Sequence, residues 1–256
     1  VFSKFDVTGP DTLRFLDALG ANRPPKPGRI GLTHALTPAG GIGSEFTVSV
    51  LTPDHAYLNS AAAAEEIDLD LLTARARDFD VTIRNRTDEL AVIGLMGPRA
   101  PEVLARLAGA DALKAFRWLT LRELKVADVP ALVLRVSYVG ESGFELHVAR
   151  ADAARLFEAI EVAGKPFGIG HYGAYAANSM RLEKGYRSWG MDLTTERTPL
   201  ETGLSYLVKS DGRGFVGRDA MLARAPNWDM VLLEIDTDGA VEPFYSHTVL
   251  AQGRAI

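Results

Sequence analysis

The chain contains no cysteine among its 256 residues. Disulfides, thiolate zinc sites, iron–sulfur ligation and a cysteine nucleophile are therefore excluded, and the lack of cysteine suits a reducing compartment. Positive charge is also scarce, because 28 basic and 33 acidic side chains give a net charge of −5. Such a balance provides no basic surface for nucleic acid. No stretch approaches the roughly 18 to 20 consecutive apolar residues of a membrane-spanning helix, so we expect neither nucleic acid nor a membrane as a partner.

The first residues contain Lys4 and Asp6 and form no signal-peptide core. The composition, 47% hydrophobic and 24% charged, is that of an ordinary globular protein. Its length suffices for one large domain or for two to three small ones. We expect a cytoplasmic protein, or a protein of the mitochondrial matrix in a eukaryote.

Helix and strand patterns interleave along the chain without regular alternation. Apolar residues at helical spacing predict helices over residues 11–19, 61–77, 97–107, 151–163, 171–186 and 219–224. Alternating apolar residues predict strands over 29–37, 45–51, 80–87, 89–95, 119–126, 131–138, 144–148, 205–209 and 230–235. The strands at 80–87 and 89–95 look like a pair. The mixture predicts an α+β fold with antiparallel sheets.

A short unit of strand, Gly-Pro and helix occurs twice. The first copy covers residues 5–19, and the second follows about 88 positions later around Gly97 and Pro98. Proline suits the first helical turn because the amide hydrogen that it lacks would be unpaired there. The repeat hints at a duplicated architecture. At the other end, a strand pattern stops at Ala255 without a closing element, so we expect an incomplete last lobe.

The segment at residues 137–146 is the most informative one. A strand pattern enters a glycine turn and leaves as another strand, so Tyr138 and Glu145 would come near each other across a hairpin. Phe144 and Leu146 flank Glu145, and strand alternation therefore places its side chain on the face opposite to both. Taken alone, this pattern also fits a solvated carboxylate on a half-exposed hairpin.

Three further segments, at residues 178–190, 198–204 and 214–220, have simple structural readings. The first fits a charged helix face with a glycine cap, the second a turn, and the third a strand that feeds a helix. The glycines of the third segment do not form a phosphate-binding loop, because neither Gly-Lys-Ser/Thr nor a dinucleotide fingerprint is present.

Taken together and in this order, the four segments resemble the glycine-cleavage T-protein (aminomethyltransferase) superfamily, and most closely its branch fused to dimethylglycine and sarcosine dehydrogenases. The first two read Tyr-x-Gly-Glu-x-Gly-Phe-Glu and Arg-Leu-Glu-Lys-Gly-Tyr-Arg-x-Trp-Gly. The others read Thr-Pro-Leu-Glu-x-Gly-Leu and Phe-Val-Gly-Arg-x-Ala. Residues 4–10 and the pair Gly41 and Ile42 also fit, so the resemblance covers nearly the whole chain.

The resemblance implies a cloverleaf of interleaved lobes with antiparallel sheets around a central folate channel. Residues 1–209 would form the folate-binding region, with two lobes, and residues 210–256 a linker and the start of a β-rich C-terminal lobe. The implied cofactor is tetrahydrofolate. FAD would be bound only by a fused or partner domain outside this chain, since no flavin fingerprint occurs here.

The implied function is one-carbon transfer to tetrahydrofolate from a small methylated amine, such as dimethylglycine or sarcosine, or from formaldehyde. The product would be 5,10-methylenetetrahydrofolate, and the chain would be the transferase part of a flavoprotein demethylase. One alternative is a flavin-free demethylase that passes the methyl group directly to folate. Others are a generic interaction domain and a non-catalytic folate-binding domain; the branch of the latter that assembles iron–sulfur clusters carries a cysteine signature absent here.

The resemblance also assigns residue roles. Glu145 would accept hydrogen bonds from the pterin ring, and Tyr138 would pack against the cofactor or hydrogen-bond to it. Relatives place a catalytic aspartate where this chain has Glu45, which keeps the charge but moves it by one methylene. Further cofactor contacts would come from Arg181 and from three residues that could equally be structural: Tyr186, Trp189 and Ser60. The last of these stands where relatives often have an asparagine, after a strand at 56–59. No metal site is expected.

Overall fold

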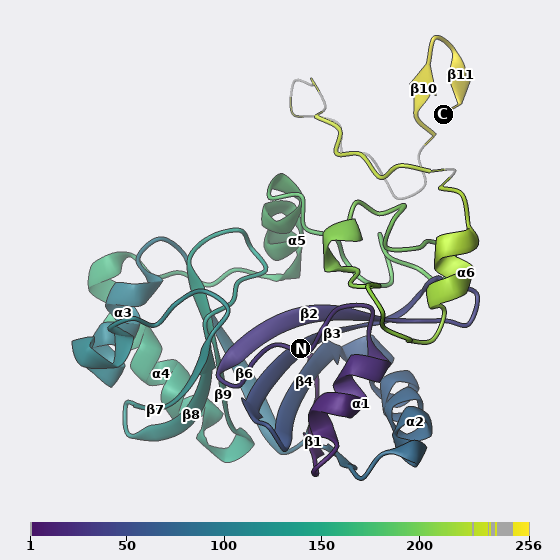
Figure 1. Ribbon diagram of the computed structural model, residues 1–256. Coiled ribbons are helices and arrows are strands. Elements are labelled where there is room, and N and C mark those ends of the chain that lie inside the picture. Colours follow the sequence, from purple (N-terminus) through teal and green to yellow (C-terminus); the bar gives the residue numbers. More distant parts are fainter. Residues whose placement is uncertain (1, 227, 235, 237–238, 240–247, 256) are drawn as a thin grey trace.

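The computed structural model describes residues 2–226, 228–234, 236, 239 and 248–255. Two antiparallel sheets dominate it, and helices cover one side of each (Figure 1). The expected α+β class is therefore confirmed. None of the helices in the described part of the chain has the length and apolar character needed to cross a membrane.

The first sheet has five strands in the order β2-β3-β4-β1-β5. On β3, Phe46, Val48 and Val50 alternate with polar residues, and these apolar side chains pack in a buried core beneath helices α1 and α2. The opposite face of the sheet is consequently polar. The elements are β1 (Phe2–Thr8), β2 (Arg29–Leu36), β3 (Ile42–Thr52), β4 (His55–Ala61), β5 (Thr82–Asn85), α1 (Thr12–Leu19) and α2 (Glu65–Arg75).

The second sheet has four strands in the order β6-β9-β8-β7. Phe144, Leu146 and Val148 of β9 pack with residues of two helices in a second buried core. This confirms the alternation that the sequence predicts for the strand carrying Glu145. The elements are β6 (Leu90–Met96), β7 (Leu121–Val126), β8 (Val129–Leu134), β9 (Gly143–Ala149), α3 (Ala100–Ala108) and α4 (Ala153–Gly164).

The expected pairing of strands 80–87 and 89–95 is wrong. β5 pairs with β1 in the first sheet, whereas β6 pairs with β9 in the second. Residues 86–89 form the connection: the Arg86 amide donates to the Lys4 carbonyl (2.7 Å), and the Glu89 amide donates to the Arg86 carbonyl (3.0 Å). The apolar residues of the two strands pack in different cores, which separates them despite their closeness in sequence.

The duplicated unit is present in both sheets. β1 leads through Gly9 into α1, and β6 leads through Gly97 into α3. Both glycines have a positive φ, of 142° and 124°. In each copy the glycine carbonyl accepts the amide three residues later, from Thr12 or Ala100, at 3.1 Å.

The remaining described residues form a third region with its own small core, which includes Leu193, Leu204 and Met221. It contains α5 (Ala174–Glu183), α6 (Arg218–Ala223) and a hairpin of β10 (Leu250–Ala251) and β11 (Arg254–Ala255). Two strand predictions are wrong here. Residues 205–207 form a 3-10 turn without a partner strand, and residues 230–234 form no strand. Ile235 lies outside the described residues.

Candidate functional site

The polar face of the first sheet is buried. Ser49 and Tyr57 are Cα partners across β3 and β4, as are Thr47 and Asn59, so their side chains share this face with that of Glu45. Asn59 is only 4% exposed, and neither the nitrogen nor the oxygen of its side-chain amide has a hydrogen-bond partner. The buried hydroxyl of Ser49 is also unpartnered. Buried polar groups are rarely left without a hydrogen-bond partner, and a polar ligand could supply the missing partners.

Glu145 lies on the corresponding face of the second sheet. Glu145 is 9% exposed, and its Oε2 atom lies 3.3 Å from Nε2 of His147, which is two positions further along β9. Its other carboxylate oxygen makes no hydrogen bond with the part of the chain that the structure describes. The cross-strand neighbour of Glu145 on β8 is Leu134, so the expected approach of Tyr138 across the hairpin is wrong. β8 ends at Leu134, and Tyr138 lies in the following loop.

A space without a side chain lies beside Glu145. Its neighbour on β6 is Gly94, and a Cβ atom built there would meet only Met96 Cε at 3.5 Å and the Tyr172 hydroxyl at 3.6 Å. Burial and the charge of Glu145 raise the pKa of Tyr172, which places that hydroxyl close to the carboxylate. Glycine at position 94 therefore leaves room for a ligand against Glu145.

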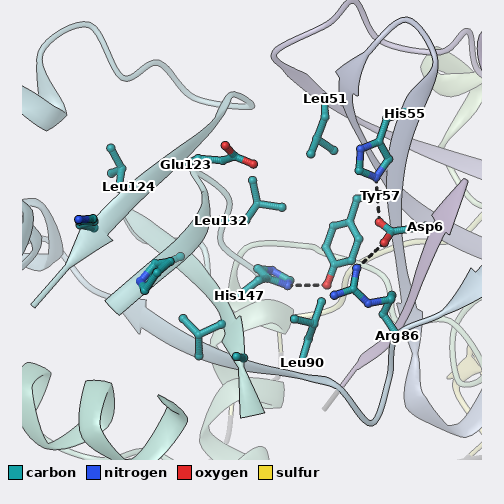
Figure 2. Close-up of a pocket in the computed structure, with 15 residues that line it drawn as sticks. Asp6, Leu51, His55, Tyr57, Arg86, Leu90, Glu123, Leu124, Leu132 and His147 are labelled. Carbon is teal, nitrogen blue, oxygen red and sulfur yellow. Dashed lines mark hydrogen bonds and ion pairs between the residues drawn. The ribbon is translucent and has the colours of Figure 1, made fainter. Parts of the chain in front are cut away.

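His147 connects the two sheets. Its Nδ1 atom lies 2.9 Å from the hydroxyl of Tyr57 on β4 (Figure 2). Both residues line a cleft of about 600 Å³ that follows β9 from His147 toward Ala149, away from Glu145. On the wall formed by the first sheet, where Tyr57 lies, the Asp6 carboxylate pairs with His55 at 3.0 Å and with Arg86 at 2.5 Å. Glu145, which contacts His147, is not among the residues that line this cleft.

Glu45 is held by a buried histidine. It pairs across β2 and β3 with His34, whose Nε2 lies 2.9 Å from Glu45 Oε2. The His34 side chain is fully buried, whereas that of Glu45 is 21% exposed. Glu45 is therefore a fixed carboxylate that still reaches solvent or a ligand.

Tyr138 lies against Tyr186 and not across from Glu145. Its ring stacks on that of Tyr186, with centroids 6.3 Å apart, and its hydroxyl donates to the Arg187 carbonyl at 3.1 Å. Burial chiefly raises the pKa of Tyr138, and the charge of Glu45 raises it further. The structure thus brings Tyr138 and Tyr186 together, and Tyr138 is within the electrostatic influence of Glu45.

Arg181 is 2% exposed and engaged by the protein. Its guanidinium donates to Asn178 Oδ1 and the Tyr186 carbonyl, both at 2.9 Å, and to the carboxylate of Asp192. These contacts hold the loop after α5 and favour a role in shaping the site. Direct contact of Arg181 with a cofactor stays a prediction.

Trp189 is half-buried and packs against the small third core. Its indole Nε1 is buried without a hydrogen-bond partner. This donor could serve a ligand, and the packing supports the structural reading that the sequence left open.

Ser60 is the predicted site residue that lies apart from the others. Its side chain points to the helix side of the sheet, beside Asp68 of α2, whereas the preceding Asn59 faces the second sheet. The alternation of Leu58, which is in the apolar core, and Asn59 could have shown this in the sequence. The structure therefore offers Asn59, with His147, as site residues that the sequence reading missed.

The buried carboxyl group of Asp68 leads to a prediction about how the stability of the protein depends on pH. Burial raises its pKa, and the nearby hydroxyls of Ser44 and Ser60 only partly oppose this. A carboxyl with a raised pKa favours the folded state below its unfolded value of 3.8, and this contribution is lost as the pH rises through the folded pKa. We expect Asp68→Asn to raise the free energy of unfolding at pH 7 by about 1 kcal/mol, and the gain to vanish near pH 4. Urea denaturation from pH 4 to 8 measures it, with exposed Asp70→Asn on the same helix as the control; a pH-independent effect would contradict it.

Comparison with known proteins places this chain in a family. The model of the GCVT N-terminal domain matches residues 1–212. The chain is 38% identical over 262 aligned positions to the mitochondrial dimethylglycine dehydrogenase of Homo sapiens, covering 100% of this chain and 30% of that protein. It is 34% identical over 257 positions to an aminomethyltransferase of Streptomyces avermitilis, covering 98% of this chain and 69% of that protein.

The fold is also found in a solved structure. The glycine cleavage system aminomethyltransferase T from Bartonella henselae matches with a TM-score of 0.76 and 24% identity, over 86% of this chain and 60% of that one. This likeness confirms the predicted architecture of helices and antiparallel sheets. Because the family model covers most of the sequence and an aminomethyltransferase matches it nearly end to end, the chain belongs to the family of the GCVT N-terminal domain.

Proposed function

We propose that this chain binds tetrahydrofolate and transfers to it a one-carbon unit from a small methylated amine of the dimethylglycine or sarcosine type. The product is 5,10-methylenetetrahydrofolate. The human relative is named a dimethylglycine dehydrogenase and the Streptomyces relative an aminomethyltransferase, which supports both the amine and the transfer. The chain spans 30% of the human protein's length, and we include in the proposal a flavoprotein oxidase part outside this chain, whose FAD would take two electrons from the amine and so bring the methyl carbon to the formaldehyde level before its transfer.

One observation carries the proposal: the two sheets enclose polar atoms that lack partners. Asn59 offers an unpaired amide, and Glu145 offers a carboxylate oxygen on the facing sheet. Leaving a buried polar group unpaired costs about 1 to 3 kcal/mol. The reduced pterin ring presents an edge of N–H donors and further acceptors, so these residues fit it.

The residues divide the task among themselves. Tetrahydrofolate, when bound, supplies the nucleophilic N5 that accepts the carbon. Glu145 accepts hydrogen bonds from the pterin, and an ionised acceptor makes these stronger than neutral ones. The stacked rings of Tyr138 and Tyr186 offer a flat surface to the aminobenzoyl group. Glu45, held by His34, orients the nucleophile and stabilises positive charge that develops on the transferred carbon.

Binding and turnover test the proposal separately. Titration calorimetry under reducing conditions measures the affinity of the chain for tetrahydrofolate. A second assay follows 5,10-methylenetetrahydrofolate formed from formaldehyde, above the uncatalysed rate. Absence of folate binding would refute the proposal; binding without turnover would leave the chain as a folate-binding module and refute the transferase role.

Gly94 gives a prediction about the shape of the site. We expect Gly94→Val to weaken tetrahydrofolate binding about 10-fold or more, because the new methyl groups occupy the space beside Glu145. Stability should change little, since valine suits a strand and the nearest atoms lie at ordinary contact distance. Gly170→Val, at an exposed position with open space around it, is the matched control. Equal affinities of the two variants would remove Gly94 from the site.

A further inference from the structure

His147 has both ring nitrogens engaged in a buried position. The residue is 3% exposed, Nδ1 lies 2.9 Å from the Tyr57 hydroxyl, and Nε2 lies 3.3 Å from Glu145 Oε2. The rings of Tyr57 and His147 meet edge to face, with centroids 5.3 Å apart and an angle of 89°. The imidazole therefore cannot turn without losing both contacts.

The surroundings decide where the protons lie. A neutral imidazole has one N–H donor and one acceptor nitrogen. Burial raises the pKa of Tyr57 most, Asn59 lowers it in part, and the charges of Asp6 and Glu145 raise it further, so the hydroxyl keeps its proton. A carboxylate only accepts hydrogen bonds, so Nε2 of His147 donates to Glu145 and leaves Nδ1 to accept from the Tyr57 hydroxyl.

From this geometry we infer that Tyr57 and His147 are positioning residues for Glu145: they fix its carboxylate as an ionised, oriented acceptor and leave the other oxygen for the N–H edge of the ligand. This inference rests on the proposed folate site.

Charged and titratable groups reach this pair from several elements, and His55, Glu123 and Lys125 line the same cleft as Tyr57 and His147. Glu145 is on the same strand as His147, and Asp6 and Arg86 act on Tyr57 from the first sheet. The Cα partners of His147 on β6 and β8 are Val92 and Leu132, which carry no charge. The Tyr172 hydroxyl lies near Glu145 from the segment before α5.

The proton assignment can be tested without folate. The nitrogen-15 chemical shifts of the His147 ring, assigned among the five histidines, are expected to show a neutral ring protonated on Nε2 at pH 7. In Tyr57→Phe, the Nδ1 atom loses its donor, and we expect a mixture of the two ring tautomers. A wild-type ring protonated on Nδ1 would overturn the inference.

Binding tests the consequence for Glu145. We expect Tyr57→Phe and His147→Leu to bind tetrahydrofolate about 10-fold more weakly than the wild type at pH 7, because the Glu145 carboxylate is then no longer held in position. His147→Gln, which keeps a donor and an acceptor, should recover most of the loss.

Two controls make the outcome clear. Tyr175→Phe changes the same group at a residue that is 95% exposed and should bind like the wild type. Thermal unfolding of each variant separates weak binding from misfolding, and Tyr57→Phe retains the buried ring. If the wild type binds folate and both Tyr57→Phe and His147→Leu keep its affinity, the inference is wrong while the proposed function stands.

Discussion

Glu145→Ala is expected to weaken the binding of tetrahydrofolate by about 1.5 to 3 kcal/mol, or roughly 10- to 150-fold in Kd. The carboxylate is nearly buried, and a polar ligand that replaces its water gains a charge-assisted hydrogen bond. Removing it leaves ligand donors unpaired in a site that offers few other acceptors. Titration calorimetry at pH 7 measures the change directly.

The same hairpin offers the control for this experiment. Glu141 is exposed and four positions away, so Glu141→Ala removes an equal charge without changing the enclosed face. We expect its Kd to stay within about twofold of the wild-type value, since exposed charges contribute little. Unchanged affinity in Glu145→Ala would exclude Glu145 from the site.

Glu45→Gln is expected to slow carbon transfer on the order of 100-fold while it changes the Kd for tetrahydrofolate less than about threefold. Glutamine keeps the shape of the side chain and its contact with His34 but carries no charge. A charge that stabilises only the transition state affects the rate and not the affinity for the ground state. Single-turnover formation of 5,10-methylenetetrahydrofolate measures the rate.

The aspartate variant tests position separately from charge. Glu45→Asp introduces the residue type that the family resemblance implies at this position but withdraws the carboxylate from His34, which lies 2.9 Å from it in this chain. We therefore expect a rate below that of the wild type despite the retained charge. Glu158→Gln on the exposed side of α4 is the control for loss of charge. Equal transfer rates of Glu45→Gln and the wild type would refute a role for Glu45.

Regular alternation made parts of the fold predictable. Phe144, Leu146 and Val148 alternate with Glu145, and one face of β9 is accordingly apolar and the other polar. Which strands pair with each other was harder to predict from the sequence, because strand pairing depends on residues far apart in the chain. The strands on either side of residues 86–89 look like a hairpin locally, yet each completes a different sheet. The pattern at 205–209 failed for a similar reason, since no neighbouring strand pairs with it.

In the candidate site, too, the residues in local motifs could be predicted from the sequence, whereas those that depend on distant partners could not. Ordered motifs point to Glu145 and Glu45, and the structure places both on the inner faces of the sheets. Asn59 was missed by one residue, because a shift of one position moves a side chain to the other face of a strand. His147 was missed because its partner Tyr57 is 90 positions away and carries no recognisable motif.

The connection at residues 86–89 also bears on how the chain forms its structure during synthesis. β1 pairs with β4 and with β5, so its neighbours in the sheet are complete only when Asn85 has left the ribosome. The contact between the Arg86 amide and the Lys4 carbonyl then closes this sheet before β9 has been translated. The first sheet can thus be complete in the nascent chain, with its polar face exposed, while the strands of the second sheet are still being translated. Its unpaired Asn59 makes that face a natural place for water, and only later for a ligand.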